Sequence, residues 1–364
     1  RVIANAQDAQ GRVPDTAPPA VFGGQDGSPP WAVAYPLIVH YLHLYNGNRR
    51  VVAEHYDNIV RWFGTLEGHA QEGIVEYGRY GDWVGLEETP MPLISTGVYY
   101  WTADLLAGFA RALKKTEDAQ RWAAKRDAIA EAFHARFFDA EAGHYGNGSQ
   151  FSQIFPLHLG IAQHQQAART RLVQQIEEAR DGHLATGILG TKYVFPVLDQ
   201  MQRTDLAWRV VLQRDYPSWG HMIDQGATTL WELWEEKTGP GMNSHNHQMF
   251  GSVVDWFFHT VGGIGKPQLP GYAYLRIAPQ VHPEVDSAST YVDTVRGRLS
   301  CTWARRAGGF VMTVDIPLSV RAEVVVPSLG LNLSARDPDL IPLEEYNDRL
   351  LFELGAGTYL FDFR

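Results

Sequence analysis

The stretch HNHQMFGSVVDWFFHTVGGIGKPQLPGY, residues 245–272, contains the change of pattern that decides the fold. Its first part carries apolar residues at the spacing of one helix face, which predicts an amphipathic helix over 245–261. The apolar stripe consists of Phe250, Val253, Val254, Phe257, Phe258 and Val261. Glycine and proline then dominate 262–272, which indicates a linker. The stretch therefore predicts a boundary between a helical part and a part of another kind.

Helical spacing dominates the chain before this stretch. We expect helices at 33–45, 51–63, 96–113, 118–138, 151–162, 167–179 and 205–214. Thr116 and Thr204 are the expected N-caps of two of them. Longer segments rich in glycine and tryptophan alternate with short turns between the helices, at 68–92, 140–150, 181–195 and 215–244. Successive helical hairpins with long loops on one side predict a toroidal helix barrel.

After residue 272 apolar residues alternate with polar ones, which is the period of a half-buried strand. The alternating sets are Leu299, Cys301 and Trp303; Phe310, Met312, Val314 and Ile316; Ala322, Val324 and Val326; and Tyr359, Phe361 and Phe363. Pro317 and Pro327 are expected to end strands. This pattern predicts an antiparallel β-sandwich of about 90 residues. We therefore expect a mainly α domain over residues 1–264 and a β-sandwich over 265–364.

Composition excludes several classes of protein. The 364 residues carry 31 Lys and Arg against 41 Asp and Glu, and this net charge of -10 argues against a nucleic-acid partner. No apolar run reaches the roughly 18 residues of a membrane-spanning helix. The single cysteine, Cys301, excludes an internal disulfide and a multi-cysteine metal site. Aromatic residues make up 12% of the chain, and flat rings line many sugar-binding clefts.

Four loop segments combine indole rings with an acid, an amide or an imidazole. They are YGDW (80–83), YPSWG (216–220), GATTLWELWE (226–235) and MNSHNH (242–247). An indole stacks on the apolar face of a sugar, while a neighbouring carboxylate or imidazole binds its hydroxyls. A carboxyl group against an indole is partly desolvated, which raises its pKa and suits proton transfer. Hydrolysis of a glycosidic bond needs two carboxyl groups, so these loops are typical of a glycosidase.

Each candidate residue also has a structural interpretation. Trp83 and Trp219 could instead anchor their loops, and Asp82 could cap a helix. Glu232 could be a structural carboxylate, and His247 could be a buried, hydrogen-bonded histidine. Glu235 begins an EEK run that is typical of a solvated surface. His245 and His247 are two residues apart, which places them on opposite sides of a helix, and no third ligand is near. We therefore expect no metal.

Several sequence motifs follow one another along the chain. They are QGRVPD (10–15), GDW (81–83), LISTGVYYW (93–101), HLATGILGTKYVFPVL (183–198), YPSWGHMIDQGATTLWELWE (216–235), MNSHNHQMFGSVVDWFF (242–258) and PGYAYLRIAPQ (270–280). As an ordered set they resemble the bacterial α-L-rhamnosidases of glycoside hydrolase family 78. The resemblance covers nearly the whole chain. It implies an (α/α)6 six-hairpin barrel followed by a C-terminal β-sandwich. It also implies hydrolysis of terminal α-L-rhamnosides with inversion, without a cofactor or a catalytic metal.

The resemblance implies roles for particular residues. Glu232, in the motif ATTLWE, matches the general base that activates water. Trp31, in the motif PPW, matches an aromatic wall of the sugar pocket. The full set of implied substrate-binding residues is Trp31, Asp82, Trp83, Trp219 and His247.

The family's general acid lies in an upstream, Asp-rich motif that we do not find in this chain. The chain also begins at Arg1 without an initiator Met. We therefore expect an N-terminal part of the same polypeptide to supply the acid. The resemblance also implies a rhamnosylated glycoside or oligosaccharide as the substrate. On its own, the chain is expected to hydrolyse aryl rhamnosides poorly. Localisation stays open between the cytoplasm and the periplasm.

Two alternatives from different classes stay open. One is another inverting helix-barrel glycosidase, acting on a glucoside or a glucuronide. The other is a carbohydrate-binding module without catalytic activity. A scaffold of helical hairpins fits less well, because scaffold repeats have short, regular turns.

Overall fold

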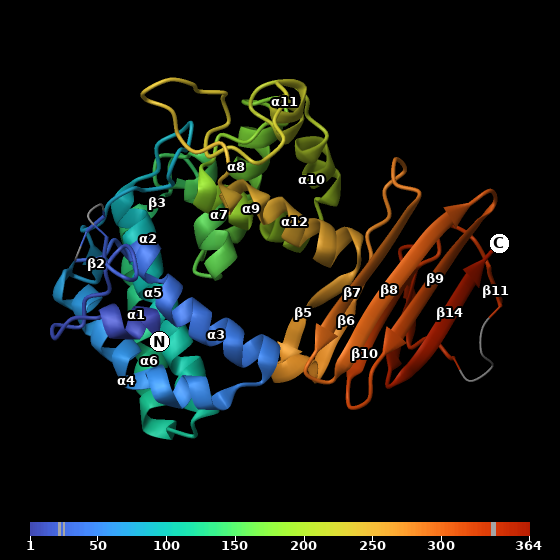
Figure 1. The fold of residues 1–364 in the computed structure, drawn as a ribbon, viewed down its shortest axis with the longest axis horizontal. Helices are drawn as coiled ribbons and strands as arrows, with labels where there is room; N and C mark the ends of the chain where they lie inside the picture. The colour runs from blue at the N-terminus through green and yellow to red at the C-terminus, as the bar shows by residue number, and fades with distance from the viewer. Residues whose placement is uncertain (21–22, 25, 336–339) are drawn as a thin grey trace. The chain divides into compact units, whose positions relative to one another are not determined.

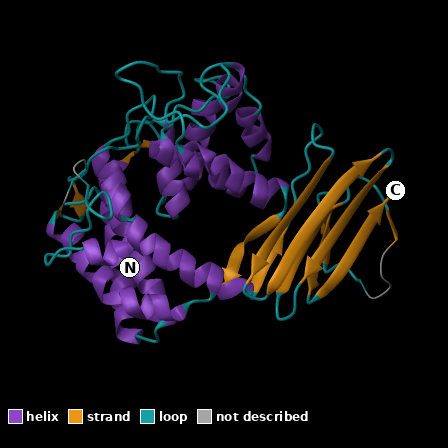
Figure 2. Cartoon of the chain, in the orientation of Figure 1, coloured by secondary structure: helices purple, strands orange, loops and turns teal. Residues whose placement is uncertain are grey.

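A computed structural model describes residues 1–20, 23–24, 26–335 and 340–364. Within that part the chain forms two compact units, residues 1–40 with 52–253 and residues 41–51 with 254–364. The first unit is mainly helical and the second mainly β-strand (Figures 1 and 2). The expected boundary after residue 264 falls at the first strand of the second unit and stays a prediction.

The helices before residue 225 are α1 (Val2–Ala6), α2 (Pro29–Ala32), α3 (Ala34–Asn46), α4 (Arg49–Gly68), α5 (Met91–Ala112), α6 (Thr116–Phe137), α7 (Gln150–Leu159), α8 (Gln165–Glu177), α9 (Ile188–Gln200), α10 (Thr204–Val211) and α11 (Trp219–Asp224). Two short hairpins lie between them, β1 (Ala70–Gln71) with β2 (Ile74–Val75) and β3 (Phe138–Asp139) with β4 (His144–Tyr145). In the part of the chain that the structure describes, no helix has both the length and the apolar character needed to cross a membrane.

Successive long helices alternate between an inner and an outer position in the first unit. Side chains are buried on all faces of α5, α7 and α9, whereas α6 and α8 bury a single stripe each. Inner α5 packs on outer α6, α7 on α8, and α9 on α10. Because consecutive helices run in opposite directions, the segments 69–90, 138–149, 178–187 and 212–247 lie at one end of the barrel. This arrangement confirms the predicted helix barrel and places the long loops together.

Most of the predicted helices are confirmed, and α9 is the clearest omission. Most of it lies in 181–195, which the sequence pattern indicated as a connection. The two predicted N-caps are also wrong. Thr116 and Thr204 are the first residues of α6 and α10, and the caps are Lys115 and Arg203, which make no side-chain cap hydrogen bond.

The helix predicted over 245–261 is broken into three pieces. A 3₁₀ turn at Gln248–Ser252 leads into a short α12 at Val253–Trp256 and then into a π-helical turn at Phe257–Val261. The wide last turn is closed by the N–H of Gly262, which donates to the carbonyl oxygen of Phe257, five residues back, at 2.7 Å. Residues 245–247 lie in a loop before these turns, so the prediction is wrong at its start.

The second unit is a sandwich of two five-stranded sheets within the described residues. Its strands are β5 (Ile264–Leu269), β6 (Tyr274–Ile277), β7 (Ser287–Thr294), β8 (Gly297–Arg306), β9 (Gly309–Ile316), β10 (Arg321–Pro327), β11 (Leu333–Ala335), β12 (Glu344–Tyr346), β13 (Arg349–Leu354) and β14 (Gly357–Phe363). The strand orders are β12-β13-β10-β6-β5 and β11-β14-β9-β8-β7. Neighbouring strands are antiparallel except β10 and β6, which run parallel.

The strand pattern of the sequence is confirmed in this unit. The alternating residues Cys301, Trp303 and Met312 are fully buried between the sheets. β9 ends directly before Pro317, and β10 ends at Pro327. The linker prediction is wrong, because β5 occupies most of it and pairs with β6.

Candidate functional site

The carboxylate of Asp82 attaches the loop before α5 to the N-terminal end of α9. Oδ2 of Asp82 accepts the N–H of Gly187 at 2.7 Å. Oδ1 accepts the N–H groups of Leu189 and Gly190 at 2.9 and 3.0 Å. A helix leaves these N–H groups without an internal partner, and its dipole favours an anion there. Asp82 therefore caps α9 from a position 105 residues earlier in the sequence.

Asp82 is deeply buried by this arrangement. Burial raises its pKa to about 6, although the three N–H donors act in the opposite direction. The backbone of α9 occupies both oxygens of the carboxylate. The structural interpretation of Asp82 as a helix cap thus describes its contacts, and its expected place in a sugar site stays a prediction.

Gly187 lets the loop approach the helix closely. The carbonyl oxygen of Trp83 accepts the N–H of Ile188 at 3.0 Å. A Cβ atom at position 187 would lie 2.0 Å from the carbonyl oxygen of Trp83 and 2.5 Å from that of Asp82. Only glycine fits such a contact, so the backbone of Trp83 is fixed against the start of α9.

The indole of Trp83 binds the carboxylate of Glu232. Nε1–H of Trp83 donates to Oε1 at 2.8 Å, and the N–H of Ser244 donates to Oε2 at 3.0 Å. Partial burial raises the pKa of Glu232, but these donors, the side chain of Asn243 and the charge of His247 outweigh it and hold the pKa below its ordinary value. Glu232 is therefore an ionised, half-buried carboxylate at neutral pH.

Glu232 lies in a loop whose two arms pair through the backbone. Its N–H donates to the carbonyl oxygen of Ser244 at 2.9 Å, and the N–H of His247 donates to that of Leu230 at 2.9 Å. This pairing places His247 on the arm opposite Glu232. Nδ1 of His247 is buried and makes no hydrogen bond within the described residues.

Three half-buried rings lead to Glu232. Tyr80 lies between Trp31, at a ring-centroid distance of 4.9 Å, and Trp83, which it meets edge-on at 5.8 Å. Trp31 comes from the short helix α2, whereas the other two rings come from the loop before α5. The structure thus brings the predicted residues Trp31, Trp83 and Glu232 together. The sequence analysis included Tyr80 in the loop segment YGDW but assigned no role to this residue.

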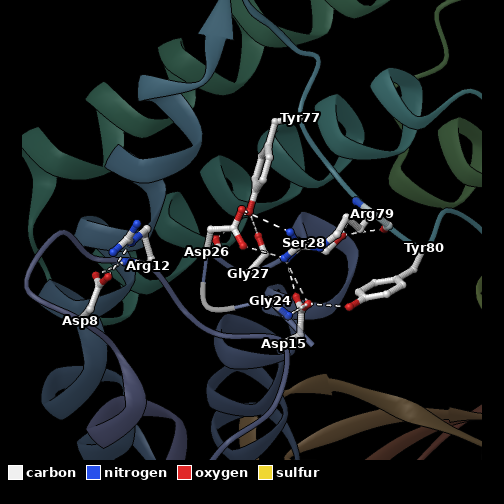
Figure 3. A network of polar contacts seen from close by, with 10 residues as sticks. All are labelled: Asp8, Arg12, Asp15, Gly24, Asp26, Gly27, Ser28, Tyr77, Arg79 and Tyr80. Carbon is white, nitrogen blue, oxygen red and sulfur yellow. Dashed lines mark hydrogen bonds and ion pairs between the residues drawn. The ribbon is translucent and has the colours of Figure 1, made fainter. Parts of the chain in front are cut away.

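A buried carboxylate, Asp15, holds Tyr80. The hydroxyl of Tyr80 donates to Oδ2 of Asp15 at 2.9 Å, and the N–H groups of Gly24 and Ser28 donate to Oδ2 and Oδ1 at 2.6 and 2.5 Å. Nη2 of Arg79 adds an ion pair to Oδ2 at 3.3 Å. Figure 3 shows these donors converging on Asp15, whose side chain is 2% exposed. Sequence reasoning assigned no role to this residue.

Trp219 is packed as an anchor at the first turn of α11. Its Nε1–H donates to the carbonyl oxygen of Phe250 at 3.1 Å. Its ring meets Trp234 edge-on at 5.1 Å and lies 5.9 Å from Phe195. Trp234 is fully buried and donates its indole N–H to the carbonyl oxygen of Thr186 at 2.9 Å. These contacts bind the α11 loop to the start of α9, and the expected sugar contact of Trp219 stays a prediction.

The chemistry available at Glu232 comes from carboxylate, imidazole and indole groups. Among the described residues, no group of three or more His, Cys, Asp or Glu side chains could hold a metal ion. A hollow of about 490 Å³ also opens between the loops, but none of the six predicted site residues lines it. Its lining residues are Pro90, Pro92, Arg136, Phe137, Phe138, Asp139, Gly146 and Asn147.

Comparison with protein families assigns both parts of the chain. Residues 1–261 match the bacterial alpha-L-rhamnosidase 6 hairpin glycosidase domain. Residues 263–337 match the bacterial alpha-L-rhamnosidase C-terminal domain.

Individual relatives cover almost the whole chain. An alpha-L-rhamnosidase of Streptomyces avermitilis is 34% identical over 99% of this chain, and one of Alteromonas sp. is 30% identical over 91%. The solved alpha-L-rhamnosidase of Dictyoglumus thermophilum has a TM-score of 0.91 at 32% identity and covers 100% of this chain and 42% of its own length. The solved Streptomyces avermitilis enzyme, complexed with L-rhamnose, has the same TM-score and identity. This chain spans 35% and 37% of the length of the two relatives named first.

Proposed function

This chain belongs to the bacterial alpha-L-rhamnosidase six-hairpin glycosidase family, and from that premise we propose that it forms part of an enzyme that removes terminal α-L-rhamnose from glycosides. The observation that carries the proposal is the carboxylate of Glu232, held by the indole of Trp83 at the loop end of the barrel. An ionised carboxylate with its pKa below the ordinary value is ready to accept a proton at neutral pH.

Glu232 acts in this proposal as the general base. It removes a proton from a water molecule, whose oxygen attacks the anomeric carbon on the face opposite the leaving group. The product is then the inverted anomer, β-L-rhamnose. In inverting enzymes the base and the acid are about 6.5–9.5 Å apart, because the water must fit between the base and the sugar.

The general acid is supplied, in this proposal, by a part of the polypeptide outside the chain. Asp82 is poorly suited to that task, because both of its oxygens accept N–H groups of α9. The share of the relatives that this chain spans, 35% and 37%, is compatible with an acid elsewhere.

The rings of Trp31, Tyr80 and Trp83 provide flat apolar surface for a deoxy sugar, which carries a methyl group in place of a hydroxymethyl group. His247 is proposed to bind a sugar hydroxyl with its half-buried imidazole ring, on the arm of the loop opposite Glu232. A Streptomyces avermitilis relative was solved with L-rhamnose, which supports the same class of ligand here.

The test is the hydrolysis of 4-nitrophenyl α-L-rhamnoside by the protein as its gene encodes it and by Glu232→Gln. The variant should lose about 10²–10⁴-fold in kcat with little change in KM. Glu235→Gln is the matched control, because Glu235 is exposed and three residues further along the same loop. Proton NMR of the first-formed sugar should show the β-anomer. Equal activity of wild type and Glu232→Gln, or a preference for an α-glucoside or a glucuronide, would contradict the proposal.

A further inference from the structure

Asp15 and Tyr80 have no acid or base role in the proposed reaction, yet continuous contacts join them to Glu232. The hydroxyl of Tyr80 binds Asp15 at 2.9 Å, and its ring meets Trp83 at 5.8 Å. Trp83 in turn donates to Glu232 at 2.8 Å. We propose that Asp15 is a positioning residue, which fixes the ring of Tyr80 against Trp83 and so holds the indole N–H of Trp83 on Glu232. This inference rests on the proposed function and names further residues that tune the same site.

Hydrogen bonds and an ion pair hold the carboxylate of Asp15 from several sides. Its side chain is 2% exposed and accepts two backbone N–H groups besides the hydroxyl of Tyr80. The buried hydroxyl of Ser28 donates to the carbonyl oxygen of Arg79 at 2.6 Å, and the N–H of Arg79 donates back to it at 2.9 Å. A Cβ atom at Gly24 would lie 1.4 Å from Nη2 of Arg79, so the guanidinium group lies directly against the backbone of Gly24.

The side chain of Tyr80 is held at its hydroxyl and on both sides of its ring, on a backbone of unusual conformation. Its φ of 73° lies in the left-handed region that L side chains rarely adopt. The hydrogen bond to Asp15 fixes one end of the side chain, and the rings of Trp31 and Trp83 fix its two sides. Without the hydroxyl bond, only its ring contacts hold Tyr80, and Trp83 loses a firmly held neighbour.

A mobile indole weakens the hydrogen bond that favours the ionised form of Glu232, so the carboxylate should take up a proton at higher pH. The other charged group that acts on Glu232 is His247, on the facing arm of its loop. Arg79 and Asp26 are the charged neighbours of Asp15. These three groups are unchanged in the two variants proposed next.

The experiment compares Asp15→Asn and Tyr80→Phe with the wild type, in the protein as its gene encodes it. Tyr80→Phe keeps the ring and removes only the hydroxyl bond, so it decides the question even if Asp15→Asn does not fold. Asp26→Asn is the matched control, because it removes another carboxylate of the network, one that binds Arg79 at 2.7 Å and is 40% exposed.

Two readouts separate the positioning role from the proposed function. The first is the pH dependence of kcat/KM for 2,4-dinitrophenyl α-L-rhamnoside, whose leaving group needs little acid catalysis. The second is the ¹⁹F NMR signal of 5-fluorotryptophan at position 83, assigned with Trp83→Phe and followed through a pH titration. The fluorine signal reports the ionisation of Glu232 whether or not any sugar is hydrolysed.

Both variants should move the acid limb of kcat/KM and the ¹⁹F midpoint to higher pH by about 0.5–1 unit. At a pH below the limb, this shift corresponds to a three- to tenfold loss of kcat/KM. The double variant should shift the acid limb and the ¹⁹F midpoint no further than Asp15→Asn does, because both single variants disturb the same hydrogen bond between Tyr80 and Asp15. Asp26→Asn should behave as the wild type. An unchanged ¹⁹F midpoint in Tyr80→Phe overturns the positioning role, even where the rhamnoside is hydrolysed. A shifted midpoint without any hydrolysis supports the positioning role and overturns the proposed function.

Discussion

Replacing Trp83 by phenylalanine is expected to raise the pH at which Glu232 becomes ionised. The change removes the N–H donor that lies 2.8 Å from Oε1 and leaves an aromatic ring in place. A hydrogen bond to a charged group contributes about 1.5–3 kcal/mol. Because Glu232 is partly exposed and water screens its charge, we expect about 1 kcal/mol here. One pKa unit corresponds to about 1.4 kcal/mol, so the pKa of Glu232 should rise by about 0.7 unit.

The assay is the pH dependence of kcat/KM for an aryl α-L-rhamnoside. Its acid limb should move to higher pH by about 0.7 unit in Trp83→Phe, which lowers kcat/KM about fivefold below the limb. Trp219→Phe is the matched control, since it also removes an indole N–H donor, one that binds the carbonyl oxygen of Phe250. An acid limb at the wild-type pH in Trp83→Phe, or an equal shift in Trp219→Phe, would refute the reasoning.

Three further predictions concern the support of the site. The folded-state pKa of Asp82 is raised to about 6, so its contribution to stability is present at low pH and is lost as the pH rises through 6. The unfolding free energy of the wild type, relative to that of Asp82→Asn, should therefore fall by up to about 3 kcal/mol between about pH 4 and pH 7. Urea denaturation at several pH values measures this difference. Gly187→Ala should destabilise the fold by about 1–3 kcal/mol in thermal unfolding, because its Cβ would lie 2.0 Å from the carbonyl oxygen of Trp83, whereas Gly64→Ala, with open space around it, should not. His247→Ala should raise KM for the rhamnoside about tenfold with kcat nearly unchanged, and an unchanged KM would contradict its contact with the sugar.

The carboxylates of Asp82 and Glu232 show how burial sets the direction of a pKa shift. Asp82 and Glu232 each accept several hydrogen bonds, but their pKa values move in opposite directions. Full burial dominates at Asp82 and raises its pKa, whereas at partly exposed Glu232 the donors dominate and lower it. Such a separation suits one carboxylate for a structural task and the other for accepting a proton.

Periodicity along the sequence was sufficient for the elements that bury one continuous face. The stripe of α6, from Trp122 to Phe137, and the alternation of Cys301 and Trp303 in β8 follow directly from which side of each element avoids water. The residue types around Glu232 and Trp83 likewise indicated a sugar-binding carboxylate with indole neighbours. These features depend on neighbours that are close in the chain, so one sequence determines them.

Tertiary structure alone decided α9 and the contacts of the site. The cap of α9 comes from Asp82, 105 residues away. Gly187 at the N-cap position, which a local pattern assigns to a loop, allows the close approach to Trp83. The bond from Trp83 to Glu232 spans 149 residues, and that from Tyr80 to Asp15 spans 65. A sequence pattern states which face of an element is buried, but not which distant group meets it. Hydrogen-bond partners and pKa values depend on distances that exist only after the chain has folded.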